Sequence, residues 1–354
     1  MTTPSVAGSP AERIVAVQHL RALAVLMVVI GHLHQTSGRI LGFSWLGDGA
    51  FFGFLGVDVF FVISGFIIHH LYRHHDGLDL RFFLNRLNRI YPMYWVITGV
   101  AAVGYVIFFR GDLLTALADG RWLTTLFLWP TGHLPLLSVG WTLVHELWFY
   151  LAYGVFLAIP ARFRIFAVAS WLVVSLVGLA GLTDGLPAWL RLIASPFNLL
   201  FLAGALIAQF RDQLDRLLPV STALAIGGAA FGVFWTLTRG LDGLTDPAVR
   251  VVVALPFAVG IVGSLLAWRP VLPALAARLG DWSYVAYLSH ALALDILARL
   301  ALRLPLADGG QALALGGVGL IAIPVLAWML HRLLERPLLS LGRQAIAEIS
   351  RKPV

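Results

Sequence analysis

Residues 14–34, IVAVQHLRALAVLMVVIGHLH, decide the fold, because this stretch is almost entirely apolar and is long enough to cross a bilayer. Arg21 and His32 interrupt it and are eleven residues apart. At about 100° per residue, eleven residues make about three turns, so both side chains lie on one helix face, roughly 16 Å apart along the axis. A cation and an imidazole inside a membrane helix are costly and are usually retained for function. The stretch therefore predicts a membrane helix that carries part of a chemical site.

Composition places the chain among membrane proteins. Of its 354 residues, 59% are hydrophobic and 12% are charged, whereas soluble domains contain roughly 45–50% apolar and about 25% charged residues. The net charge of +7 is typical of basic loops on the cytoplasmic side of a membrane. Membrane lipids are therefore expected partners, and nucleic acid is not.

Metal and thiol chemistry are not expected. Cysteine is absent, which excludes disulfides, thiolate nucleophiles and Cys-based metal sites. The histidines His69, His70, His74 and His75 lie in a basic segment without an array of carboxylates, so we interpret them as part of a solvated cationic loop and expect no metal.

Ten apolar runs have about the length of a membrane span. They predict an all-α polytopic membrane protein with about ten transmembrane helices and no soluble domain. We expect tails at 1–13 and 335–354 and a membrane domain at 14–334. The runs cover residues 14–34, 49–70, 91–109, 138–158, 163–182, 189–209, 217–237, 249–268, 283–303 and 311–334.

Basic residues predict the orientation. With the N-terminus in the cytoplasm, the segments on that side, among them a loop from His69 to Arg89, hold about twice as many Lys and Arg residues as the segments outside. Both tails are therefore expected to be cytoplasmic.

Polar residues inside the apolar runs are candidates for the chemistry. Asp58 and Glu146 each need a partner within the helix bundle. They are interpreted either as acid–base and orienting groups or as members of structural ion pairs. His290 lies in the short polar group Tyr287-Leu288-Ser289-His290. It is interpreted equally as a functional residue of the same kind or as a structural histidine.

Arg86 and Arg89 are three residues apart, so they are neighbours on a helix. Guanidinium groups bind phosphates through forked hydrogen bonds. The pair is therefore a candidate phosphate site, and anionic lipid headgroups are the alternative partners.

Six segments stand in order along essentially the whole chain: Arg21-x10-His32, GVDVFFVISGF at 56–66, Phe83-x-x-Arg86-x-x-Arg89-Ile90-Tyr91-Pro92, Trp141-Thr142-Leu143 to Glu146 with Phe149-Tyr150, Tyr287–His290 and Glu335-Arg336-Pro337. In this order and spacing they resemble the membrane acyltransferase 3 family. The form Gly140-Trp141-Thr142-Leu143 is most similar to the exopolysaccharide-modifying branch.

The resemblance implies an O-acyltransferase of the bacterial inner membrane, with residues 14–334 as its domain. Such an enzyme moves an acyl group, usually acetyl, from cytoplasmic acyl-CoA to a hydroxyl of a surface or exported polysaccharide or of a lipid-linked sugar. The residues so implied are His32 as base or acyl carrier, Arg21 as positioner of the donor, Asp58 and Glu146 as orienting groups, Arg86, Arg89 and Tyr91 for CoA, and Trp141, Thr142 and His290 for the acceptor.

A second function remains open from the residues alone. A transporter or flippase for a glycolipid or an anionic solute, without acyl transfer, would explain charges inside the membrane equally well.

Overall fold

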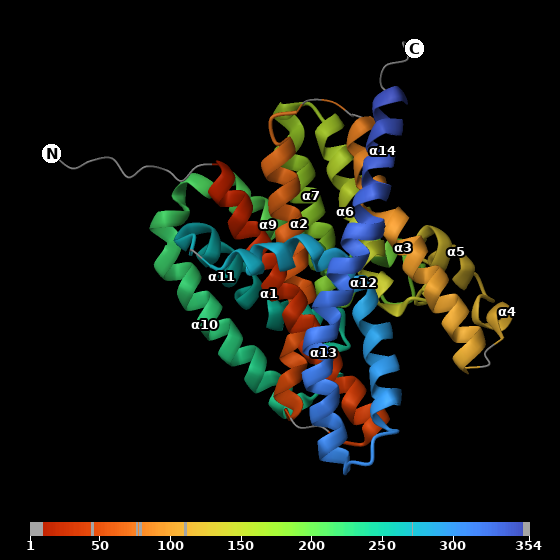
Figure 1. Ribbon diagram of the computed structural model, residues 1–354. Coiled ribbons are helices and arrows are strands. Elements are labelled where there is room, and N and C mark those ends of the chain that lie inside the picture. Colours follow the sequence, from red (N-terminus) through yellow and green to blue (C-terminus); the bar gives the residue numbers. More distant parts are fainter. Residues whose placement is uncertain are drawn as a thin grey trace. The chain divides into compact units, whose positions relative to one another are not determined.

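The computed structural model describes residues 10–43, 46–75, 77, 80–109, 112–270 and 272–349, and every regular element in these ranges is a helix (Figure 1). The predicted all-α fold is confirmed. The chain forms two compact units that interleave along the sequence. The first contains Met1–Tyr72, Leu199–Ser283 and Pro305–Leu313, and the second contains Arg73–Asn198, Tyr284–Leu304 and Ala314–Val354.

The first unit is built around the N-terminal helices. Helix α1 packs against the 3-10 helix η2 and against α2, and α10 packs along α11. Its elements are α1 (Pro10–Thr36), the π-helix η1 (Ser37–Leu41), η2 (Asp48–Leu55), α2 (Gly56–Tyr72), α9 (Asn198–Gln209), η5 (Arg211–Gln213), α10 (Leu214–Arg239), η6 (Asp242–Leu244), α11 (Pro247–Trp268) and the first part of α12 (Ala274–Ala301).

Glycines set the approach of helices α2 and α9 in this unit. A Cβ atom on Gly65 would overlap the carbonyl oxygen of Phe201, and one on Gly204 would overlap that of Val62. Helices that associate inside a membrane rely on such small residues, because close backbone contact takes the place of a hydrophobic driving force. Neither glycine can therefore be enlarged without moving one helix.

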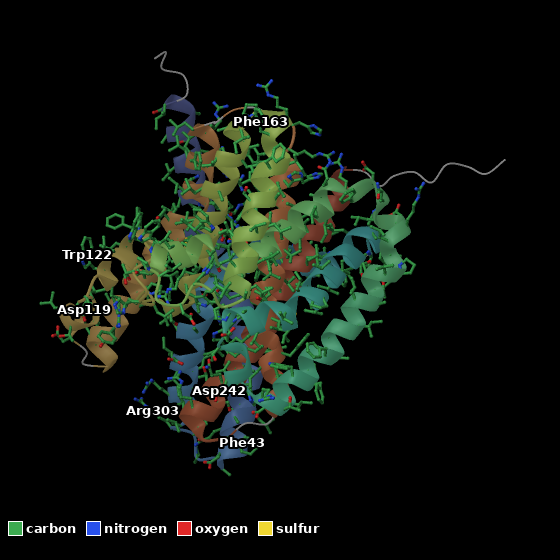
Figure 2. The ribbon with its side chains drawn as sticks, turned by 180° about the vertical axis from the view of Figure 1, so that it is seen from behind. Phe43, Asp119, Trp122, Phe163, Asp242 and Arg303 are labelled. Carbon is green, nitrogen blue, oxygen red and sulfur yellow. The ribbon has the colours of Figure 1, made fainter. Side chains whose placement is uncertain are left out.

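The second unit contains the remaining elements, of which α3 packs against both α6 and α14. They are α3 (Leu80–Phe109), α4 (Leu113–Ala116), α5 (Arg121–Phe127), η3 (Ser138–Gly140), α6 (Trp141–Ala158), η4 (Ala161–Phe163), α7 (Arg164–Leu179), α8 (Ala188–Ile193), the end of α12, most of α13 (Asp308–Leu330), the π-helix η7 (His331–Glu335) and α14 (Arg336–Ile349). Asp119 and Trp122 mark the short α4–α5 segment in Figure 2.

Nine helical segments within the described ranges are long and apolar enough to cross a membrane. Large apolar side chains such as Ile165, Ile226 and Ile321 stay exposed on them, as expected for faces that meet lipid. The chain is thus a polytopic membrane protein. The segments are Val15–Leu41, Asp48–Tyr72, Leu80–Ile107, Ala161–Leu179, Ala188–Gln209, Arg211–Arg239, Pro247–Trp268, Ala274–Ala301 and Asp308–Ile349.

The tenth predicted run, residues 138–158, folds as η3 and α6 but is not among these nine segments. Its polar side chains, His145 and Glu146 among them, lower the hydropathy of the helix. Helix α6 has 18 residues, which span about 27 Å, close to the roughly 30 Å of a bilayer core. Its length therefore still permits a crossing.

Several helix boundaries differ from the predicted runs. Helix α3 begins at Leu80 and not at residue 91, so Arg86 and Arg89 lie on one helix, as their spacing predicts. Helix α12 begins at Ala274 and not at residue 283, and the run at 189–209 is divided into α8 and α9. At the other end of the chain, the helical backbone continues past residue 334 through η7 and α14 to Ile349.

Candidate active site

Helix α1 carries Arg21 and His32 on one uninterrupted helix of 27 residues, as the sequence predicts. The Nδ1 atom of His32 lies 3.0 Å from the carbonyl oxygen of Val28. Because a carbonyl only accepts hydrogen bonds, Nδ1 carries the proton and Nε2 becomes the basic nitrogen. One turn of backbone therefore fixes the tautomer that a general base needs.

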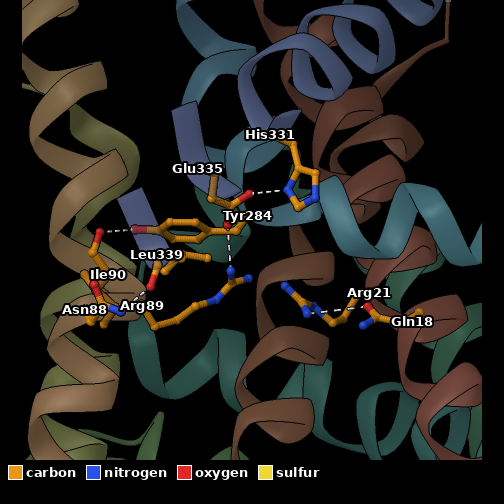
Figure 3. A network of polar contacts seen from close by, with 9 residues as sticks. All are labelled: Gln18, Arg21, Asn88, Arg89, Ile90, Tyr284, His331, Glu335 and Leu339. Carbon is orange, nitrogen blue, oxygen red and sulfur yellow. Dashed lines mark hydrogen bonds and ion pairs between the residues drawn. The ribbon is translucent and has the colours of Figure 1, made fainter. Parts of the chain in front are cut away.

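Arg21 is anchored separately on the same helix. Its Nη1 atom donates to Oε1 of Gln18, 3.4 Å away and one turn earlier (Figure 3). The guanidinium is thus held near the middle of α1, roughly 16 Å along the axis from His32.

Asp58 lies in the first turn of α2, with its carboxylate fully buried. Its partner is Arg250 in the first turn of α11, whose Nε and Nη2 atoms lie 3.0 and 2.9 Å from Oδ2. Arg250 is not among the residues that the sequence singled out. A buried carboxylate in an apolar run implies a cation nearby, but not which one.

Arg250 also connects Asp58 to the surroundings of His32. Its Nη2 atom donates to the carbonyl of Phe54, 2.8 Å away, and the Phe54 ring meets the His32 ring edge to face at 4.6 Å. Arg250 interacts electrostatically with His32 as well. The first unit therefore brings His32 and Asp58 together through Phe54 and Arg250.

Glycines place η2 directly against α1 at this point. A Cβ atom on Gly53 would overlap the Met27 carbonyl, and one on Gly56 would overlap the Ala24 carbonyl. The Phe54 backbone is thereby fixed between the helix that carries His32 and the arginine that binds Asp58.

In the second unit, Arg89 forms an ion pair with Glu335, whose carboxylate is fully buried (Figure 3). The Nη1–Oε1 distance is 2.6 Å, and the other oxygen of Glu335 lies 2.6 Å from Nδ1 of His331. The Arg89 guanidinium also stands 5.0 Å from the centre of the Tyr284 ring. A π-helical turn, which is frequent at functional sites, presents His331 and Glu335 on the same side.

Arg86 lies one turn before Arg89 in different surroundings. Its guanidinium is 5.9 and 5.8 Å from the centres of the Phe82 and Tyr150 rings, within reach of cation–π attraction. The Tyr150 hydroxyl donates to the carboxylate of Glu146, and both arginines interact electrostatically with Tyr150. Three predicted site residues, Arg86, Arg89 and Glu146, thus gather around one tyrosine in this unit.

Tyr91 has a different environment from the two arginines. Its hydroxyl donates to the carbonyl of Phe127 at the end of α5, 2.7 Å away. Two further side chains of α3 donate to carbonyls of α5 in the same way, Tyr94 to Thr125 and Trp95 to Leu126, both at 2.8 Å. The last carbonyls of a helix lack partners within the helix, and these three side chains of α3 supply the partners.

The three predicted acceptor-binding residues are divided between two small groups. The Thr142 hydroxyl lies 3.0 Å from the Tyr287 hydroxyl, and the Tyr287 ring lies 5.7 Å from the fully buried ring of His290. Trp141, at the start of α6, packs its ring 5.3 Å from that of Phe197.

The residues that the sequence did not single out are mainly partners of those it did: Arg250, His331 as the partner of Glu335, and Tyr284. Tyr150 and Glu335 were recognised only as parts of family motifs. Among the described residues, no group of three or more His, Cys, Asp or Glu side chains is placed to hold a metal ion.

The Arg89–Glu335 pair yields a stability prediction. Removing one partner of a buried ion pair leaves the other charge unpaired. Arg89→Gln should therefore lower the free energy of unfolding by roughly 2–4 kcal/mol, a figure that is reduced because Arg89 is partly exposed to solvent. The double variant Arg89→Gln/Glu335→Gln should recover most of this loss. The midpoint of thermal unfolding in detergent measures both. An equal loss in the single and double variants would show that the charge left on Glu335 is not the cause of the loss.

Comparison with known proteins identifies the family. A family model described as an acyltransferase domain, that of acyltransferase 3, matches residues 14–332. The chain is 32% identical over 308 residues to the exopolysaccharide production protein ExoZ of Rhizobium meliloti (strain 1021), a match that covers 82% of this chain and 91% of that protein. No solved structure matches the chain.

A second relative matches over a shorter stretch. The peptidoglycan O-acetyltransferase OatA of Listeria monocytogenes serovar 1/2a is 34% identical over 104 residues, which are 28% of this chain and 15% of that protein. With the family model over nearly its whole length and helices suited to a membrane, this chain belongs to the acyltransferase 3 family and is a multi-pass membrane acyltransferase.

Proposed function

We propose that this acyltransferase moves an acetyl or other short acyl group from acyl-CoA to a hydroxyl of an exported or surface polysaccharide or of a glycolipid. The observation that carries the proposal is the 3.0 Å contact between Nδ1 of His32 and the Val28 carbonyl oxygen, from which the Nδ1-protonated tautomer follows. An imidazole base held in this way is suited to activate a hydroxyl.

The proposed reaction replaces the thioester bond of acyl-CoA with an oxygen ester bond on the acceptor. Nε2 of His32 accepts the proton of the acceptor hydroxyl while the hydroxyl oxygen attacks the thioester carbonyl. The carbon–sulfur bond then breaks, the thiolate of CoA leaves, and the proton returns from His32 to the thiolate. The products are the acyl ester and free CoA.

Arg86 and Arg89 are the candidates for binding the donor phosphates, because planar guanidinium groups bind phosphates through forked hydrogen bonds. Arg89 forms the ion pair with the buried Glu335 carboxylate, and Arg86 lies one turn earlier against the rings of Phe82 and Tyr150. We propose that Arg86 binds the phosphates and that Arg89 supports its surroundings.

The acceptor is proposed from the relatives. ExoZ is named for exopolysaccharide production and OatA for peptidoglycan O-acetylation. Both names concern glycans of the cell surface, so a glycan hydroxyl is the proposed acceptor here, with Trp141, Thr142 and His290 as candidates for binding it.

A comparison of the surface glycans of cells with and without the protein tests this assignment. Mass spectrometry of isolated exopolysaccharide should show acetyl esters, each of which adds about 42 Da to the glycan. These esters should disappear in the deletion strain and return on complementation with the wild type but not with His32→Ala. Identical ester content in both strains would remove exopolysaccharide as the acceptor.

The proposed location is the bacterial inner membrane, with both termini in the cytoplasm. Four of the nine apolar segments lie between His74 and Asp242, and α6 would be the fifth crossing. If α6 crosses, the two positions lie on opposite sides of the membrane, and if it does not, they lie on the same side. Since the chain has no cysteine, single cysteines at these exposed positions can be labelled without background.

In intact cells, a membrane-impermeant maleimide should label Asp242→Cys and leave His74→Cys unmodified. Permeabilised cells, in which both variants should react, provide the control. Labelling of both positions, or of neither, in intact cells would contradict the crossing by α6, and labelling of His74→Cys alone would reverse the orientation.

A further inference from the structure

The ion pair of Asp58 and Arg250 is unusually well enclosed for two charges. The carboxylate is fully buried and the arginine side chain is 12% exposed. Burying such a pair costs several kcal/mol for each ion unless the geometry is good. Here the guanidinium supplies two nitrogens to one carboxylate and a further hydrogen bond to the Phe54 carbonyl.

That further hydrogen bond leads toward His32. Phe54 lies in the last turn of the short η2 segment beside α1, and its ring packs against the His32 imidazole. The Phe51 ring stacks on the Phe54 ring at 6.0 Å and so supports it. The imidazole is thus held by Val28 through Nδ1 and by Phe54 through its ring.

We propose that Arg250, held in place by Asp58, is a positioning residue for His32. The proposal rests on the proposed function, in which His32 is the base. Arg250 fixes the Phe54 backbone and thereby the plane of the imidazole, and Asp58 fixes the direction of the guanidinium fork. A reacting group displaced by about 1 Å can lose about a hundredfold in rate, so this support acts on turnover.

The test uses the double variant Asp58→Asn/Arg250→Gln, because removal of both charges leaves no unpaired buried ion. We expect kcat to fall about 10- to 100-fold, while KM for acetyl-CoA stays within about twofold. The matched control is Asp215→Asn/Arg269→Gln, which removes a more exposed Arg–Asp pair of the same unit with the same 2.9 Å contact. The control should keep the wild-type kcat.

Non-additivity separates positioning from a general structural effect. In a His32→Ala background, the same double substitution should cause no further loss of rate, because residues that act as a unit are not additive. An equal loss in both backgrounds, or an unchanged kcat with His32 present, would overturn the proposal. Arg250→Lys should also lower kcat, because an ammonium lacks the planar fork.

A measurement that does not depend on catalysis tests this inference separately from the proposed function. Diethyl pyrocarbonate modifies imidazoles, and peptide mass spectrometry measures its rate at His32. This rate should rise at least about fivefold in the Asp58→Asn/Arg250→Gln variant, because Phe54 no longer fixes the ring. An unchanged rate overturns the inference, and a wild type that transfers no acyl group overturns the proposed function instead.

Discussion

Replacing His32 with alanine is expected to lower kcat for acyl transfer by a factor of about 10²–10⁴, the usual contribution of a general base. The Nε2 atom that accepts the hydroxyl proton is lost, and no backbone group can replace it. Binding of acetyl-CoA should change little, because the donor is proposed to be held by Arg86. Release of CoA thiol, followed with a thiol reagent, measures the rate, and the cysteine-free chain adds no background.

His133→Ala is the control for this variant, since His133 lies exposed in the loop between α5 and α6. It should retain the wild-type rate. Near-normal transfer by a folded His32→Ala protein would exclude the catalytic role and leave His32 as a packing residue between Val28 and Phe54.

Replacing Arg86 with glutamine is expected to raise the Kd for acetyl-CoA at least about tenfold, because a charge-assisted hydrogen bond contributes roughly 1.5–3 kcal/mol. The effect should be larger at low salt, where the attraction between the guanidinium and the phosphates is less screened. Isothermal titration with acetyl-CoA measures the constant. Titration with acetyl-pantetheine, which lacks the CoA diphosphate, should show no difference between the two proteins.

Arg81→Gln is the matched control, because Arg81 lies exposed near the start of the same helix. It should bind acetyl-CoA as the wild type does. Arg89→Gln should lower the midpoint of thermal unfolding as well, since Arg89 is paired with Glu335. Unchanged affinity in Arg86→Gln would assign the guanidinium to another anion, such as a lipid headgroup.

Local patterns in the sequence predict much of this fold. The apolar run of α1 is enough to predict one helix with Arg21 and His32 on a common face, because helix geometry depends only on residue spacing. Helix α6 is harder to predict, since its polar residues lower its hydropathy while its length still suits a bilayer. The extension of α14 beyond residue 334 was missed, because its residues form no long apolar run.

The ion pairs of the candidate site, in contrast, could not be predicted from local patterns in the sequence. The sequence identifies Asp58 as a buried charge that needs a partner, but Arg250 lies 192 positions away. Arg89 and Glu335 are likewise separated by 246 positions. Such pairs arise from tertiary packing, which no local periodicity encodes. Charges inside apolar runs therefore predict that partners exist, and the fold decides which residues they are.

Acyl transfer by the purified protein tests the central claim most directly. Wild-type protein in lipid nanodiscs is incubated with radiolabelled acetyl-CoA and an exopolysaccharide deacetylated with mild alkali. We expect label in alkali-sensitive esters of the polysaccharide together with an equal amount of free CoA thiol, and neither product with His32→Ala. Intact acetyl-CoA and unlabelled polysaccharide after incubation with the folded wild type would contradict the account and favour transport without acyl transfer.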